Sequence, residues 1–411
     1  MSAAPRPGSR CQQALAWVLP AAAWATYAPV GLKYPFWLVV TGLSVVVVHQ
    51  QKLWCTVWRQ PGPVLLLTWV GWMLVSAFWS PAPGLDIATH AWIYALPLGA
   101  IFIGAACPPA AAKRGLTLFA TASGCVGGLW FMHANGVLPD SLLWDSTLLA
   151  TGNQRIASSV LLALGAAIGC WLLPHQIGPV RRTVLALAAV LATMGLASQD
   201  RRSGMVLLPL LFLAWALAAP RPLAWRAALM AAVCLAATAV WVASGTVRGR
   251  FAEGSNEIST YSSSAPVVTS WGIRLRMYEV TAEMVRERPV FGHGLGSWQQ
   301  LWAQRVPFGT RLAENSTPHN DYLMVAAQAG APAAVLLLGW WLVMARNAVR
   351  AGTMGIPALM VWLTMAVTAL ANATLRDAKF ALPFLFLAGL TLAIESRHTA
   401  RLKFDPTDRQ H

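Results

Sequence analysis

Charged side chains are scarce in this sequence. Only 11% of its 411 residues are Asp, Glu, Lys or Arg, and 57% are hydrophobic, whereas a soluble domain carries about 25% charged residues. This composition excludes an ordinary soluble globular domain. Lipid is expected to be the solvent for most of the chain.

Several motifs of metal, redox and nucleotide sites are missing. The sequence has no Cys-x-x-Cys pair, no Walker motif and no Asp-rich metal signature, and its six cysteines lie in or beside apolar stretches. None of the cysteines falls between residues 245 and 320, so no disulfide is expected there. We therefore expect no metal site, no cofactor and no nucleic-acid partner.

Long apolar runs are abundant. Segments of about 17–25 apolar residues can cross a bilayer as helices, which predicts an all-α polytopic membrane protein with about twelve spans. The first run, 14–28, resembles a signal peptide but is expected to stay attached. The predicted spans are 12–29, 35–50, 63–79, 87–106, 115–134, 156–173, 183–198, 203–219, 225–244, 321–345, 355–373 and 379–395.

The basic residues of the short connections predict the orientation. With the N-terminus inside, sixteen Lys and Arg lie in connections on the inner side and six in short outer connections. The positive-inside rule then places both termini in the cytoplasm, with an even number of spans between them. The expected parts are a membrane bundle of about nine spans (1–244), a periplasmic loop (245–320), three further spans (321–395) and a cytoplasmic tail (396–411).

The periplasmic loop has three kinds of local pattern. Residues 253–271 are rich in Ser, Thr and Gly, which favours a flexible segment that closes as a lid. From Arg274 to Arg288 apolar residues recur at helical spacing, which predicts an amphipathic helix with its apolar face on the membrane surface. Gly292-His293-Gly294-Leu295-Gly296 follows no strand, so it indicates a tight turn near ligand or membrane rather than a dinucleotide site.

Arginines mark most of the short outer connections. These are Arg155, the Arg201-Arg202 pair and Arg376. The planar guanidinium matches phosphate oxygens in a bidentate way and keeps its charge. The set favours a site for a lipid-linked phosphate or diphosphate, with interfacial snorkelling or pairing to acidic residues as the alternative.

A histidine lies where the periplasmic loop re-enters the membrane, in Thr317-Pro318-His319-Asn320-Asp321. Histidine takes up a proton near neutral pH, which suits a general base acting on a hydroxyl. Asn320 and Asp321 are expected to cap the following helix or to orient the ring. An interfacial histidine with a purely structural role is the alternative.

Taken in order, these pieces resemble the bacterial O-antigen ligase and polymerase superfamily. The resemblance rests on Arg274 with Tyr278, then Arg288-Pro289-Val290-Phe291-Gly292, the Gly294-Leu295-Gly296 turn, and His319-Asn320 with Tyr322-Leu323. It covers some fifty residues directly, and the span layout extends it over most of the chain. Tyr278 departs from the Trp common at its position but keeps an aromatic platform.

The resemblance implies a glycosyltransferase with a periplasmic active site. In the ligase, a polysaccharide moves from undecaprenyl diphosphate to a sugar hydroxyl of lipid A–core, without metal or nucleotide and with inversion expected. It implies His319 as the base and Arg202 and Arg274 as diphosphate ligands, with Arg201 competing for the role of Arg202. Physical reasoning alone adds four further candidates, Arg155, Arg276, Arg288 and Arg376.

Three other functions compete with the ligase. An O-antigen polymerase would use a second lipid-linked glycan as acceptor, and a protein O-oligosaccharyltransferase would use Ser or Thr. A lipid-linked glycan transporter or flippase would carry charges at span centres or paired broken helices. The span interiors are almost free of charge and the candidate residues gather at one face, which favours an enzyme.

Overall fold

A computed structural model describes residues 10–138, 153–199, 202–262, 269–306 and 315–404. These residues form helices and connections, with no strand among them. The first half of the chain contains α1 (Arg10–Ala25), α2 (Val30–Gln50), α3 (Trp54–Trp58), α4 (Pro61–Val75), η1 (Ser76–Trp79), α5 (Gly84–Ala95), α6 (Pro97–Ala106), α7 (Pro109–Ala134), α9 (Asn153–Leu172), η2 (Leu173–His175) and α10 (Pro179–Ala197).

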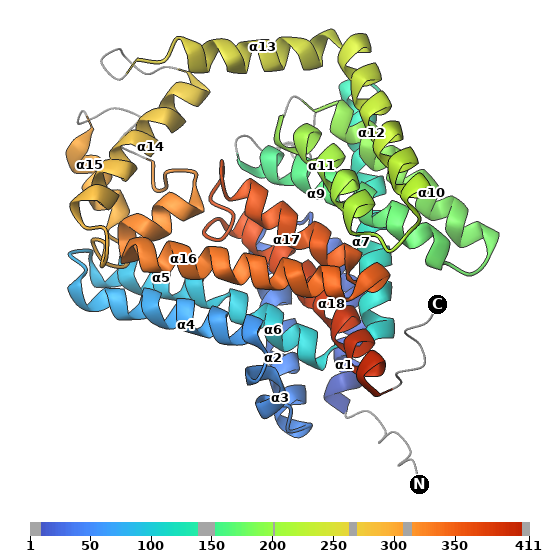
Figure 1. The fold of residues 1–411 in the computed structure, drawn as a ribbon, viewed down its shortest axis with the longest axis horizontal. Coiled ribbons are helices and arrows are strands. Elements are labelled where there is room, and N and C mark those ends of the chain that lie inside the picture. The colour runs from blue at the N-terminus through green and yellow to red at the C-terminus, as the bar shows by residue number, and fades with distance from the viewer. Residues whose placement is uncertain (1–9, 139–152, 200–201, 263–268, 307–314, 405–411) are drawn as a thin grey trace.

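The second half contains the helices that surround the candidate site (Figure 1). They are α11 (Arg202–Ala218), α12 (Leu223–Ala243), α13 (Gly245–Ser259), α14 (Ser270–Glu287), α15 (Trp298–Arg305), α16 (Asp321–Arg350), η3 (Gly352–Gly355), α17 (Ile356–Thr368) and α18 (Ala378–Phe404).

Each predicted span coincides with a helix, or with two consecutive helices in the case of α5 and α6. In the part of the chain that the structure describes, nine segments are long and apolar enough to cross a membrane. The helices at the other three predicted positions, α1, α11 and α17, are shorter, at 16, 17 and 13 residues. The all-helical membrane architecture is thus established, while the count of twelve stays a prediction.

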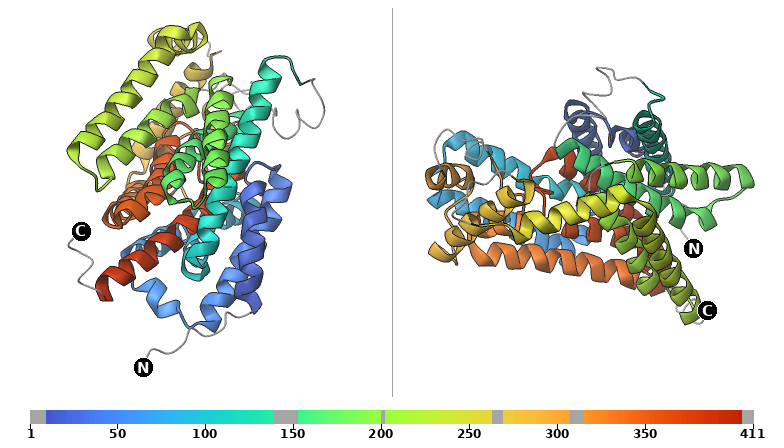
Figure 2. Two further views of the ribbon diagram at one scale, coloured as in Figure 1. Left: turned by 90° about the vertical axis from the view of Figure 1, so that its right-hand side faces the viewer. Right: turned by 90° about the horizontal axis from the view of Figure 1, so that it is seen from above.

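Small residues let the helices of the bundle approach closely. Where α7 packs on α10, a methyl group added to Gly127 would clash with the backbone of Leu191 and Ala192, and one on Gly124 would clash with Ala188. Glycine and alanine interfaces of this kind are typical of helices that associate in lipid. By contrast, α12 packs mainly on α11 and α13 and stands at the edge of the bundle (Figure 2).

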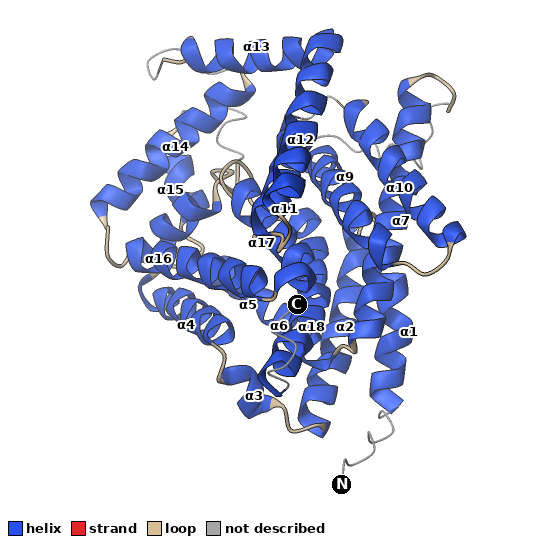
Figure 3. Ribbon diagram, turned by 45° about the vertical axis from the view of Figure 1, so that its right-hand side comes forward, coloured by secondary structure: helices blue, strands red, loops and turns tan. Residues whose placement is uncertain are grey.

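Connections on the two sides of the bundle gather in two separate groups. The connections before α16 and before α18 meet at one end, where the second of them also contacts His90 of α5. At the other end of α16, Trp171 donates a hydrogen bond to the carbonyl of Thr353 at 3.1 Å, and Gly352 approaches Pro220. Figure 3 shows the first group between α14 and α17. This grouping agrees with the predicted alternation of outer and inner connections.

Residues 253–271 are more ordered than their composition indicated. Helix α13 continues to Ser259, and in Figure 1 it runs across the top of the molecule from α12 to α14. Its start is capped by Ser244, whose hydroxyl accepts from the amide of Val247, and Arg250 pairs with Glu253 at 3.0 Å. The prediction of a flexible segment is wrong for residues 253–259, and 263–268 lie outside the described residues.

The amphipathic helix exists, but its apolar face does not lie on a membrane surface. Helix α14 buries Met277, Val280 and Met284 against Trp298 and Trp302 of α15 and against the start of α16. The placement on the membrane surface was therefore wrong. An apolar stripe shows that a helix face is covered, but the stripe is the same for lipid and for protein.

The glycine-rich turn repairs a break in α16. The helix is interrupted at Gly330 (φ +79°), and Pro332 has no amide hydrogen to donate to the carbonyl of Gln328. Gly294 supplies that hydrogen bond instead at 2.7 Å, and His293 donates to the carbonyl of Ala327 at 2.9 Å. In exchange, the amide of Ala331 donates to the carbonyl of Pro289 at 2.7 Å.

The turn therefore contacts the protein's own backbone, which corrects the expectation of a contact with ligand or membrane. Gly292 has φ +64°, and a methyl group on it would lie 2.5 Å from the backbone of Gln328. Only glycine fits such a position at low cost. We call these hydrogen bonds between the glycine-rich turn and α16 the interlock. The interlock fixes the first part of α16, which begins two residues after His319.

Candidate functional site

His319 has a backbone conformation that is rare outside glycine. Its φ is +53°, in the left-handed region that costs an ordinary residue about 1–2 kcal/mol and that His, Asn and Asp adopt more readily than most. Its amide donates to the hydroxyl of Thr317 at 2.9 Å, and Asn320 directly after it caps α16. These contacts turn His319 away from the helix that follows.

The imidazole of His319 lies in a cationic, half-buried environment. Burial, followed by the charges of Arg274 and Arg376, lowers its pKa to about 4, and the carboxylate of Asp377 partly opposes this. Its Nδ1 is buried and has no hydrogen-bond partner among the described residues. The ring is therefore neutral at pH 7, and its Nδ1 is not bound by any residue that the structure describes.

Helix α14 brings Arg274 to this site. Thr269 caps the helix, and Glu257 of α13 accepts a hydrogen bond from the amide of Trp271 at 2.9 Å. The guanidinium of Arg274 lies over the ring of Trp271, 5.4 Å from its centroid, a geometry that favours a cation.

Tyr278, one turn further along α14, ties the helix to the site. Its hydroxyl lies 3.0 Å from the carbonyl of Leu370 and 3.4 Å from that of His319. The hydroxyl of Tyr278 thus holds α14 to the segments that carry His319 and Leu370, while the role of its ring as an aromatic platform stays a prediction. Burial raises the pKa of this phenol, so it remains a hydrogen-bond donor at neutral pH.

Arg376 enters the site from the connection between α17 and α18. Its Nε lies 3.3 Å from Nε2 of His90 in α5, and its Nη1 donates to the hydroxyl of Ser316 at 3.0 Å. Together these contacts join segments that lie almost three hundred residues apart in the sequence.

The two residues after His319 hold the site together without contacting its ring. Asn320 accepts from the amide of Leu323 at 3.0 Å and donates to the carbonyl of Leu370 at 3.0 Å. Asp321 is buried, and its carboxylate accepts from the amide of Leu375 at 2.9 Å. The predicted cap is Asn320, while Asp321 fixes the segment that carries Arg376.

Two of the predicted arginines, Arg155 and Arg202, lie at the starts of two helices that touch each other. Arg155 lies in the first turn of α9, and α11 begins at Arg202. The two helices touch close to these ends, since a methyl group on Gly204 would clash with the carbonyl of Ser159. The side chain of Arg202 and the whole of Arg201 lie outside the described residues, so their roles stay predictions.

Two predicted arginines point elsewhere. Arg276 pairs with Glu279 at 3.4 Å on α14 itself. Arg288 is exposed at the far end of α14, about 21 Å along the helix from Arg274 at 1.5 Å per residue. The structure does not bring either of them to His319.

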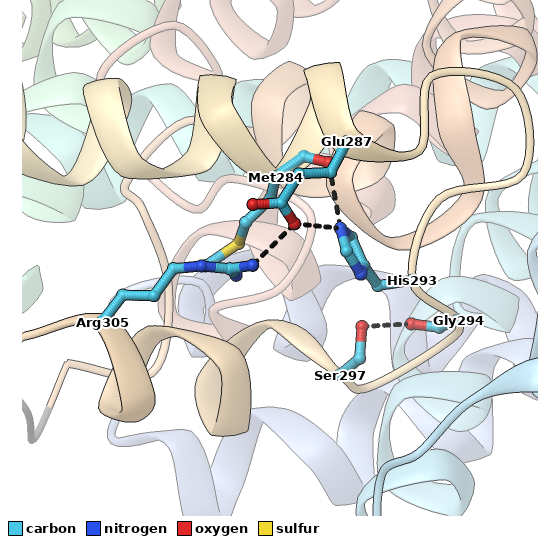
Figure 4. Close-up of polar contacts among 6 residues, drawn as sticks. All are labelled: Met284, Glu287, His293, Gly294, Ser297 and Arg305. Carbon is cyan, nitrogen blue, oxygen red and sulfur yellow. Dashed lines mark hydrogen bonds and ion pairs between the residues drawn. The ribbon is translucent and has the colours of Figure 1, made fainter.

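His293, the other histidine of the same connection, has a structural environment. Its Nε2 lies 2.9 Å from the carbonyl of Met284 and 3.5 Å from the carboxylate of Glu287, both acceptors, so this nitrogen carries a proton. Figure 4 shows Glu287 between His293 and Arg305, with the Arg305–Glu287 contact at 2.6 Å. His293 therefore ties the glycine-rich turn to the end of α14, and Arg305 ties α15 to the same carboxylate.

Three members of the site were not predicted as such from the sequence. They are His90, Ser316 and Asp377. A lone His in an apolar helix carries no motif, so only the packing reveals it.

The fold and the site define a multi-spanning membrane protein with a neutral histidine and two arginines gathered at one end of its helices. Such a site suits the transfer of a group from an anionic leaving group to a hydroxyl.

Comparison with known families agrees with this class. Residues 187–338 match a family model described as O-antigen ligase. The match supports the O-antigen ligase and polymerase superfamily, which the order of the motifs indicated. The match includes Arg202, Arg274 and His319, whereas His90 and Arg376 lie outside it. No curated protein matches the sequence.

Proposed function

We propose that the protein is an O-antigen ligase that moves a glycan from undecaprenyl diphosphate to a sugar hydroxyl of lipid A–core at the periplasmic face of the inner membrane. The observation that carries the proposal is the neutral imidazole of His319, whose Nδ1 has no partner among the described residues, in the field of Arg274 and Arg376. A base and fixed cations are the two groups that this transfer requires.

His319 is the general base. It takes the proton of the acceptor hydroxyl while the acceptor oxygen attacks the anomeric carbon of the donor sugar. The bond from that carbon to the diphosphate oxygen breaks, and the electron pair leaves with undecaprenyl diphosphate. The configuration at the anomeric carbon inverts, because the acceptor attacks opposite the leaving group.

Arg274 and Arg376 bind the diphosphate. Their guanidinium groups meet the charge that grows on the leaving oxygen, where fixed donors are most effective. Their charges also hold down the pKa of His319 in the free protein. A bound diphosphate offsets those charges and raises the pKa of His319, so the donor itself makes the base stronger.

The arginines at the starts of α9 and α11 extend the cationic surface. Arg155, Arg201 and Arg202 attract the phosphorylated donor and acceptor, and Arg202 contacts the diphosphate as the family resemblance implies. Arg276 and Arg288 are left out of the diphosphate site because of their positions on α14.

The acceptor distinguishes the ligase from the polymerase of the same superfamily. The chain has a single long connection, 245–320, on the proposed outer side, which supports the ligase. The superfamily assignment applies to both enzymes, so the acceptor has to be tested directly.

The test uses purified protein, undecaprenyl-diphosphate-linked O-antigen and lipid A–core, in EDTA and without nucleotide. We expect glycan on lipid A with the wild type. His319→Asn should be inactive, since Asn tolerates the left-handed backbone but is not a base. His293→Gln serves as the matched control and should stay active. Longer lipid-linked glycan without lipid A modification would identify a polymerase instead, and full activity of His319→Asn would remove the proposed base.

A further inference from the structure

His90 is a buried polar residue in the apolar helix α5, on the side of the bundle that carries the site. Only 4% of its surface is exposed. Its Nδ1 lies 2.8 Å from the carbonyl of Asp86, one turn earlier in the same helix, and its Nε2 lies 3.3 Å from Nε of Arg376. Each ring nitrogen therefore has one polar partner.

The hydrogen-bond partners of His90 determine which of its ring nitrogens carries a hydrogen. Arg376 is a donor and never an acceptor, so Nε2 of His90 must accept and carries no hydrogen. The carbonyl of Asp86 can only accept, so Nδ1 carries the hydrogen. His90 is thus a neutral imidazole in one tautomer, oriented by its own helix so that a lone pair faces Arg376.

The remaining contacts of Arg376 make the arrangement rigid. Ser316 accepts from its Nη1 at 3.0 Å, and the preceding residue, Leu375, is bound through its amide to the buried carboxylate of Asp321. The contacts with His90 and Ser316 use two of the five N–H groups of the guanidinium. The other three have no hydrogen-bond partner among the described residues, and Arg376 lies close enough to His319 for its charge to lower the pKa of that ring.

We propose that His90 is a positioning residue, which holds the guanidinium of Arg376 so that its free N–H groups face the diphosphate of the donor. This inference rests on the proposed function. An arginine side chain without such support samples several rotamers and must be ordered when the leaving group departs. A guanidinium held in place beforehand stabilises the leaving charge at no such cost.

To position Arg376, the side chain at residue 90 needs a hydrogen-bond acceptor where Nε2 of His90 lies. His90→Gln can place its carboxamide oxygen near that position, whereas Asn is one methylene too short to reach it and Phe has the shape without an acceptor. We expect His90→Gln to keep most of the transfer rate. His90→Asn and His90→Phe should lose roughly 10- to 100-fold in kcat, the range for loss of a group that orients a ligand-binding residue. Thr89→Val, on the exposed side of α5, should have no effect.

A double-mutant cycle separates positioning from general stability. If His90 acts through Arg376, then adding His90→Phe to Arg376→Ala should not lower the transfer rate further. Each rate is measured in the assay of undecaprenyl-diphosphate-linked O-antigen and lipid A–core, with folding checked by size-exclusion chromatography and thermal unfolding. Equal rates for His90→Gln and His90→Asn, or independent losses in the cycle, would overturn the proposal.

The same experiment distinguishes this inference from the proposed function. Full activity of Arg376→Ala would remove Arg376 from diphosphate binding and thereby refute the underlying site at this residue. Loss of activity in Arg376→Ala with wild-type rates in His90→Asn and His90→Phe would leave the diphosphate site intact and refute only the role of His90.

Discussion

His293 and His319 lie in the same connection, but the hydrogen-bond partners of their ring nitrogens differ. His293 has its protonated nitrogen directed at the carbonyl of Met284 and the carboxylate of Glu287, while Nδ1 of His319 has no partner within the described residues. His319 also lies in the field of two arginines. The residue type is identical, so the difference lies in the segments that pack around each ring.

The pKa of His319 depends on the charge of Arg274. Burial and the two arginines disfavour the imidazolium, which lowers the pKa to about 4. Arg274→Gln removes one of these positive charges, so the pKa of His319 should rise towards 6.5. The measurement is a pH titration of the histidine ring nitrogens by ¹⁵N NMR in nanodiscs, with the His319 signal assigned from its absence in His319→Asn.

Arg276→Gln is the matched control for this titration. Arg276 lies two residues further along α14 but pairs with Glu279, and its charge is not among those that act on His319. The pKa of His319 should therefore stay near its wild-type value in Arg276→Gln. An unchanged pKa in Arg274→Gln, or equal shifts in both variants, would contradict the described electrostatics.

Arg274 is expected to act through its shape as well as its charge. Arg274→Lys keeps the charge but loses the planar fork and the stacking on Trp271. The transfer rate should fall by about 100-fold, as for the loss of one fixed donor at a developing anion. Arg276→Lys should transfer glycan at the wild-type rate. Near-normal transfer by Arg274→Lys would count against bidentate diphosphate binding.

Among the elements, the interlock between the glycine-rich turn and the broken helix α16 positions the segment that carries His319. The turn returns to α16 the hydrogen bonds that the helix loses at Gly330 and Pro332. Unpaired backbone groups at this depth are expensive, so the turn and the break are expected to form together. The glycines are therefore structural, although they resemble a ligand-binding loop in the sequence.

Gly292→Ala tests this interlock. The new methyl group meets the backbone of Gln328 at a position with φ +64°, and both effects destabilise, by an expected ~2 kcal/mol or more. The apparent midpoint of thermal unfolding in detergent should fall. Gly249→Ala is the control, because Gly249 lies inside α13 with open space around it. That variant should unfold at the wild-type temperature or slightly above, and an equal decrease in both variants would refute the interlock.

The elements also show which predictions the sequence supports and why others fail. Helical apolar spacing located α14, but the stripe of Met277, Val280 and Met284 does not distinguish a membrane surface from α15 and α16. The Ser- and Gly-rich end of α13 was predicted to be flexible from its composition. Two contacts stabilise it: Ser244 caps the helix, and Glu257 accepts a hydrogen bond from α14. The composition of the segment does not reveal these contacts. Patterns within a segment were predictable, whereas its partners were not.

At the scale of the whole molecule, the site is built from segments that only the complete bundle brings together. His319 and Arg274 carry motifs and were predicted together, whereas the approach of His90 to Arg376 follows from the packing of α5 near the α17–α18 connection. The side chains of Arg201 and Arg202 lie outside the described residues, so their part in the site remains a prediction.

Sidedness of the membrane is a prediction at this scale. Gln300 is exposed on α15, and Cys55 is exposed on α3 near the opposite end of the bundle. In intact spheroplasts, an impermeant maleimide should label Gln300→Cys in a Cys55→Ser background. The native Cys55 should be labelled only after the membrane is permeabilised. The reverse pattern would place the site in the cytoplasm.

The most direct test of the account separates donor binding from transfer in His319→Asn. Binding of undecaprenyl-diphosphate-linked glycan and the rate of the first turnover onto lipid A–core are measured on the same protein. Donor affinity should stay close to that of the wild type, because Arg274 and Arg376 remain, and transfer should fall by at least about 100-fold, because no base is left. A first turnover at the wild-type rate would contradict the central claim that His319 deprotonates the acceptor.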